Sequence, residues 1–201
     1  NGRLVVFALH YNNRPLRGDT LDALKIDCAK ALPSPFNPEP SAYQSGMWVA
    51  GTWTRDGRQI EAIVHHEYHA DQYKRCAGRN GLACWYNTIL AASSKDGGAR
   101  FDRHDYPVIA AAPFTQDVDQ TRHRGFFNPS NMFSDGRHVY FFAAETGWSG
   151  QAHGVCLFRS DDPAKPRNWR AFDGRAFTIR YDDPYRPGLR TPAACRPVAP
   201  F

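Results

Sequence analysis

The sequence predicts an all-β fold made of short antiparallel strands. One observation is composition, because the 201 residues include 13 Phe, 9 Tyr and 5 Trp together with 16 Gly and 15 Pro. Aromatic residues favour strands, whereas glycine and proline favour the turns between them. The other observation is a repeated pattern. The hairpin-type dipeptides Asp56-Gly57 and Asp135-Gly136 are each followed by an arginine and then by an apolar, strand-like run.

An Asn-Gly dipeptide at the start of the sequence opens a first unit, which is expected to cover residues 1–40. An apolar strand follows it at Leu4–Leu9. Further along, helical spacing between Leu21 and Ala29 competes with a strand at Leu24–Cys28, and the strand is the favoured alternative.

Two further units are expected at residues 41–112 and 113–180, and each is a run of antiparallel strands. Two such units in succession are typical of β-propeller blades, which have four strands each. About two and a half blades are present, against about four to eight in a closed propeller. A fragment of a larger propeller is the favoured interpretation, and closure by association into an oligomer or an open pair of sheets are the alternatives. The predicted strands are Met47–Thr54, Ile60–Val64 with its continuation to His69, Cys84–Ala92, a strand from Phe101, Phe126–Phe133, Val139–Ala144, Gly154–Arg159, Trp169–Phe172 and Phe177–Arg180.

The last segment, residues 181–201, has five prolines and little periodicity. We therefore expect this segment to be a linker, a wrap over the surface, or the beginning of another blade.

Charge and hydropathy narrow the classes of partner. The net charge is +5 and the 25 basic residues are scattered, whereas nucleic-acid binders usually cluster theirs. The longest apolar run, Leu4–Leu9, is far shorter than the roughly 20 residues of a membrane-spanning helix. We therefore predict neither a nucleic-acid partner nor a membrane association.

The cysteines predict an exported protein. Cys76 and Cys84 bracket a short polar loop, which favours a local disulfide. Such a bond indicates a secreted or periplasmic location. The pairing of Cys28, Cys156 and Cys195 stays open, the odd count leaves a free thiol or an intermolecular bond, and Cys156 has the apolar neighbours of a core residue.

Ser94–Phe101 matches the Asp-box pattern S-x-D-x-G-x-x-[W/F], which forms a tight turn between two strands of a blade. Ser160 and Asp162, with Trp169 downstream, are a looser version at the equivalent place in the next unit. In such turns the Ser and Asp side chains cap backbone N–H groups and glycine takes a positive φ. These acidic residues are therefore predicted to be structural.

The main candidates for a functional site lie in the stretch Gln59–Asp71, where three histidines and a glutamate follow a strand-like run. Side chains alternate along a strand, so His65, Glu67 and His69 are expected on one face, and His66 and Tyr68 on the other. A carboxylate between two imidazoles can transfer protons, bind a polar ligand, or hold a single divalent ion as a minor possibility; no other cofactor is expected. The alternative is a polar rim where a buried strand meets solvent.

A resemblance to a known superfamily rests on three features. These are N-P-S-N at Asn128–Asn131, D-G-x-x-V-Y-F-F at Asp135–Phe142, and the Ser-Asp turn followed by Trp169. Together they resemble the five-bladed β-propeller glycosidases, which include arabinanases, xylosidases and invertases, and a group of exported bacterial propeller proteins is similar too. The resemblance covers most of residues 1–180 and implies a glycosidase site made of an Asp base, a second Asp and a Glu acid. The first Asp has no counterpart here, and the second would fall at Asn128–Asn131, where amides stand.

The sequence thus predicts a carbohydrate-active, glycoside hydrolase-like protein. Glu67, flanked by His65 and His69, is the predicted general acid, and Glu145 is the predicted base or orienting group, with a solvated rim carboxylate as the alternative for Glu145. A non-catalytic glycan-binding or structural propeller fragment is the other hypothesis. The predicted contacts to sugar are Asn128 and Asn131 by hydrogen bonds, and Tyr68, Trp148 and Trp85 by stacking.

Overall fold

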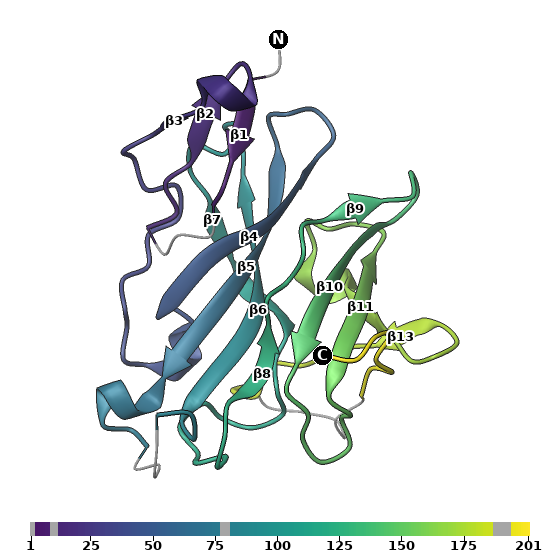
Figure 1. Ribbon diagram of the computed structural model, residues 1–201. Helices are drawn as coiled ribbons and strands as arrows, with labels where there is room; N and C mark the ends of the chain where they lie inside the picture. Colours follow the sequence, from purple (N-terminus) through teal and green to yellow (C-terminus); the bar gives the residue numbers. More distant parts are fainter. Residues whose placement is uncertain (1–2, 9–11, 77–80, 187–193) are drawn as a thin grey trace.

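The computed structural model describes residues 3–8, 12–76, 81–186 and 194–201 (Figure 1). Within those ranges the secondary structure is thirteen strands and four short 3-10 helices, which confirms the all-β prediction. None of the helices in these ranges has the length and apolar character needed to span a bilayer.

The first four-stranded module covers the middle of the chain. It is an antiparallel meander of β4 (Gly46–Thr54), β5 (Ile60–His69), β6 (Trp85–Ser94) and β7 (Asp102–Ala110). All four strands predicted for residues 41–112 are therefore present. The predicted continuation of the second strand is correct, since β5 runs unbroken to His69.

The second module is also antiparallel, and it contains one departure from the prediction. The expected strand Phe126–Phe133 is interrupted, because Asn128 takes a positive φ of 47° and Pro129 follows it. The two pieces on either side of the break both pair with the same neighbouring strand. The strands of this module are β8 (Arg124–Phe127), β9 (Phe133–Ser134), β10 (Val139–Glu145), β11 (Gly154–Ser160), β12 (Arg170–Phe172) and β13 (Phe177–Ile179).

The two modules lie side by side and share a core, and the described sheet is not closed (Figure 1). Short parallel pairing joins β6 to β8, with Asn87 opposite Gly125. Gly125 has a φ of 119°, and a Cβ there would collide with the Asn87 carbonyl oxygen, so glycine is required. Ile63 of the first module packs in the same buried cluster as Phe126 of the second.

The described part of the first unit is a small separate sheet. It consists of β1 (Leu4–Val6), β2 (Leu16–Gly18) and β3 (Lys25–Ile26), with the 3-10 helix η1 (Leu21–Ala23) before the last strand. The predicted strand at Leu24–Cys28 is thus present in shorter form. The predicted strand at Leu4–Leu9 ends at Val6, and its last residue lies outside the described ranges.

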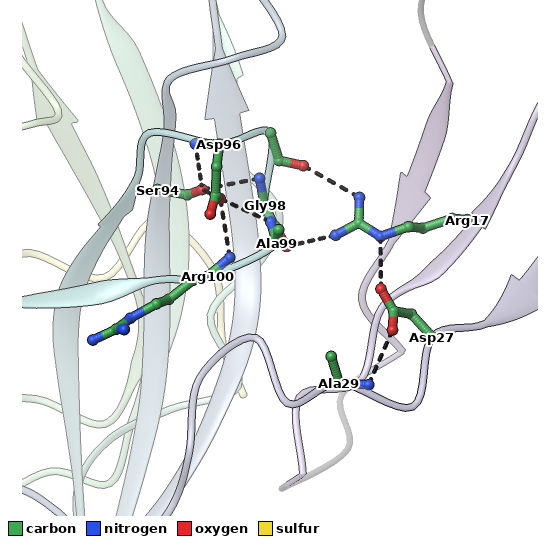
Figure 2. Close-up of polar contacts among 9 residues, drawn as sticks. Arg17, Asp27, Ala29, Ser94, Asp96, Gly98, Ala99 and Arg100 are labelled. Carbon is green, nitrogen blue, oxygen red and sulfur yellow. Dashed lines mark hydrogen bonds and ion pairs between the residues drawn. The ribbon is translucent and has the colours of Figure 1, made fainter.

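Residues 94–101 form a turn that holds this small sheet, as Figure 2 shows. Ser94 Oγ accepts a hydrogen bond from the Gly98 N–H at 2.9 Å, and Asp96 Oδ1 accepts one from the Arg100 N–H at 3.0 Å. The backbone hydrogen bond from Arg100 is the main reason why the pKa of Asp96 is lowered. Arg17 of β2 donates to the Gly98 carbonyl oxygen at 2.9 Å. The acidic side chain therefore has a structural role, as predicted.

Two disulfide bonds are present. Cys76 pairs with Cys84, as predicted, and Cys156 pairs with Cys195, which the sequence left open. Cys156 is buried, as predicted, and Cys28 is an exposed free thiol.

The second bond ties the end of the chain to β11. Val155 donates to the Ala199 carbonyl oxygen at 3.0 Å, and Val198 donates back to Val155 at 2.8 Å. The described end of the proline-rich segment, residues 194–201, therefore packs against β11.

Candidate functional site

Strand β5 presents one face to the second module along its whole length. Glu61, Ile63, His65 and Glu67 lie on this face, and His66 lies on the other among buried groups. The middle of the face, at Ile63, belongs to the shared core, whereas the two ends are polar. The predicted alternation of side chains is therefore observed.

The candidate site is the end of β5, where a carboxylate lies between two imidazoles. His65 Nε2 lies 3.2 Å from Glu67 Oε1, and His69 Nε2 lies 3.5 Å from Glu67 Oε2. About a quarter of the Glu67 side chain is exposed, at 24%, and His69 is similar at 29%. The carboxylate is thus held by neighbours and still reachable from solvent.

A backbone group of the second module contacts the His65 ring. The Asn128 N–H donates to His65 Nδ1 at 3.2 Å, and a backbone N–H can only donate. Nδ1 is the accepting nitrogen in this contact, and Nε2 lies 3.2 Å from Glu67 Oε1. Asn87 Nδ2, which is a donor, lies 2.9 Å from the same Nε2.

Glu67 is ionised at neutral pH. Burial raises the pKa of its carboxyl, but the hydrogen bonds and the electrostatic interaction with His65 and His69 outweigh burial and lower the pKa to about 2. A carboxyl with this pKa cannot donate a proton near pH 7. The low pKa favours a base or hydrogen-bond acceptor at Glu67 over the general acid, and the catalytic role of this residue stays a prediction.

Trp85 and His123 extend the cluster. The Trp85 ring is stacked between His69, at a centroid distance of 5.1 Å, and His123, at 4.2 Å. Both faces of the indole are covered, so it offers no free face for the sugar stacking predicted from the sequence. Burial lowers the pKa of His123 to about 4, and its Nε2 contacts Asn87 Oδ1.

Two members of this cluster were missed from the sequence. Asn87 could have been found, because the hairpin closed by the Cys76–Cys84 bond places it directly opposite Glu67. His123 precedes β8 on a loop, and no periodicity or motif marks it.

Most of the residues predicted to contact sugar instead make contacts within the fold. Asn128 is exposed and reaches the cluster through its backbone. Asn131 joins the modules, since its Oδ1 accepts from the Thr52 N–H at 2.8 Å. Tyr68 is fully buried and donates to the Pro38 carbonyl oxygen, and Trp148 packs against Phe126 at 5.5 Å.

Glu145 is not part of the cluster. It lies on β10, three strands from β5, which puts their backbones about 14 Å apart at ordinary strand spacing. It is fully buried, so the alternative of a solvated rim carboxylate is wrong. Burial raises its pKa to about 7, against the opposing backbone hydrogen bonds from Gly147 and Gly154.

This raised pKa predicts a pH-dependent stability. Because the pKa of Glu145 is about 7 in the folded state and near its ordinary 4.5 when unfolded, its contribution is fully present below pH 4.5 and is lost as the pH rises to 7. Glu145→Gln should remove this loss, so the variant gains melting temperature relative to the parent at pH 8 but not at pH 4. Thermal melts of both proteins across this range test it, and parallel curves would contradict it.

The side chains of the cluster are not grouped as a metal-binding site. His65 and His69 both direct Nε2 at Glu67. Over the described ranges no three His, Cys, Asp or Glu side chains are grouped to hold a metal ion.

Comparisons with known proteins give one structural likeness. No protein-family model matches the sequence, and no curated protein matches it. One solved structure, that of a proposed glycosidase from Bacteroides thetaiotaomicron, aligns with 69% of this chain at 15% sequence identity and a TM-score of 0.41. The aligned chain spans 40% of that protein's length. A TM-score of this size does not establish a shared fold.

Proposed function

We propose that this protein is carbohydrate-active and holds its sugar at the end of β5. The observation that supports this best is an ionised carboxylate fixed between two imidazoles at a partly exposed position. A carboxylate accepts hydrogen bonds from neighbouring hydroxyl groups, and an imidazole N–H donates one. Vicinal hydroxyls are the polar groups that a saccharide ring presents, so Glu67 with His65 and His69 is complementary to it.

The proposal includes a glycoside hydrolase-like activity on a five-bladed propeller scaffold, in a secreted or periplasmic protein. The two disulfide bonds support the location, because such bonds persist in oxidising compartments. In hydrolysis Glu67 would act as the base or nucleophile, given its low pKa.

Glycan binding without hydrolysis is the second candidate, and one observation favours it. Hydrolysis uses two carboxyl groups about 5–9.5 Å apart. In the described part of the chain Glu67 is the one carboxylate hydrogen-bonded within the cluster, and Glu145 is three strands away.

Two substitutions at one position separate these candidates. Glu67→Gln keeps the size and hydrogen-bonding capacity but removes the base, so it should abolish hydrolysis while glycan affinity falls less than about tenfold. Glu67→Ala removes the hydrogen bonds too, and affinity should fall by about tenfold or more. Calorimetric titration with a glycan that the parent retains, together with a reducing-sugar assay, measures both quantities.

Glu39→Gln is the matched control. Glu39 is half-exposed and pairs with Arg75 away from the cluster, so its change should leave binding and hydrolysis unaltered. If Glu67→Ala binds as well as the parent, the sugar does not lie at Glu67.

A further inference from the structure

The opposite end of the same β5 face contains a cleft that the proposed function does not use. Glu61 lies six residues before Glu67, which is about 20 Å along an extended strand. The cleft has a volume of about 410 Å³, within the range of small-molecule sites. It lies between the first module and the turn after β11, and its lining includes Trp53, Arg55, Glu61, Asp161 and Asp162.

Glu61 is a buried carboxylate without a basic partner. It is only 4% exposed, and no described Lys, Arg or His lies within ion-pair distance of it. It is held in place by neutral donors, since Gln59 Nε2 donates to Oε1 at 2.9 Å and Ser93 Oγ donates to Oε2 at 2.5 Å. His104 Nε2 lies 2.8 Å from Ser93 Oγ and so reaches the carboxylate only through the hydroxyl. A buried carboxylate in such surroundings favours a cation beside it.

The walls of the cleft carry further negative charge, of the same sign as the Glu61 carboxylate. Asp56, Asp161 and Asp162 line it together with Glu61, and Arg55 is the single basic residue of the described lining. Asp162 is already paired with Lys165 at 2.9 Å, and Asp161 accepts from the Asn168 amide at 3.1 Å. The field inside the cleft therefore favours a positively charged guest.

An aromatic ring in the cleft already has a cation on it. The Arg55 guanidinium lies 5.2 Å from the centre of the Trp53 ring, and no described carboxylate is within ion-pair distance of it. Arg55 is an exposed side chain at the end of β4, so it can swing away at little cost. Its position shows that the Trp53 face accepts a cation.

We propose that this cleft binds a compact organic cation that also bears hydroxyl groups, that is, an amino sugar. The ammonium group pairs with Glu61, the apolar face of the ring lies on Trp53 in place of Arg55, and the hydroxyls donate to Asp161 and to the Gln59 amide oxygen. A simple aliphatic amine would only pair its charge with Glu61. An amino sugar pairs its ammonium group with Glu61 and also donates a hydroxyl hydrogen bond to Asp161 on the opposite wall.

The test uses glucosamine and its neutral counterpart N-acetylglucosamine, titrated into the full chain and followed by amide chemical shifts. Glucosamine should bind and shift the amide signals of residues 53–61 and 161–164, and N-acetylglucosamine should not. Glu61→Gln is isosteric, keeps an acceptor oxygen for Gln59 Nε2 and can donate its amide N–H to the Ser93 hydroxyl, and it should weaken glucosamine binding by about ten- to a hundredfold. Asp22→Asn, on the exposed helix η1, removes the same charge at a distance and should change nothing.

Other results overturn the proposal. Equal binding of the two sugars, no binding of glucosamine, or full affinity in Glu61→Gln would each do so. Should Glu61→Gln unfold, Asp161→Asn on the exposed turn replaces it and should weaken binding in the same direction. Glu67→Ala leaves this cleft intact. Amide chemical-shift changes that glucosamine still causes in that variant would therefore show that this site is distinct from the one at the end of β5.

Discussion

Phe126→Ala should lower the free energy of unfolding by about 3–5 kcal/mol, which is the usual cost of emptying a buried aromatic site. The Phe126 side chain is completely buried between the modules. Its ring lies 4.6 Å from that of Tyr181, 5.5 Å from Trp148 and 5.8 Å from Phe158. Three large rings around one cannot collapse into the space together, so the cavity should persist. Urea denaturation followed by tryptophan fluorescence gives the value.

Phe133→Ala is the control for this experiment. Phe133 is exposed on β9 and stacks on Tyr140 and Phe142 at the surface, so its loss should cost about 1 kcal/mol or less. Similar losses for the two variants would mean that the modules do not share a core around Phe126.

Removing the Cys156–Cys195 bond should cost about 4 kcal/mol. The bond closes a loop with a sequence separation of 39, and the entropy lost by the unfolded chain grows with loop length. By the same relation the Cys76–Cys84 bond, with a separation of 8, is worth about 2.5 kcal/mol. Paired Cys→Ala variants of each bond, compared by chemical denaturation, should therefore rank in this order.

Cys28→Ala is the matched control, because Cys28 is an exposed free thiol whose replacement should leave stability unchanged. If removing the Cys156–Cys195 bond lowers stability less than removing the Cys76–Cys84 bond, the end of the chain contributes little to the second module.

Much of the fold could be predicted because hairpin dipeptides and strand alternation are local signals. Asp56-Gly57 fixed the β4–β5 hairpin, and alternation placed His65 and Glu67 on one face. The break at Asn128 was missed although Pro129 is a local signal for it, whereas the contact that the Asn128 N–H makes with His65 comes from another module and is not visible in the sequence.

The site was predicted only where it lies within one strand. His65, Glu67 and His69 are brought together by β5 alone, whereas Asn87 comes from the next strand and His123 from another module. The protonation state of Glu67 was also out of reach, because it depends on which imidazole nitrogens face the carboxylate.

In the proposed function, Glu67 and its two imidazoles hold a sugar. The most direct measurement is a glycan array probed with the parent protein and with Glu67→Ala, with Glu39→Gln alongside. We expect the parent and Glu39→Gln to retain the same glycans and Glu67→Ala to lose them. Retention of those glycans by Glu67→Ala, or no retention by the parent, would mean that Glu67 does not hold a sugar.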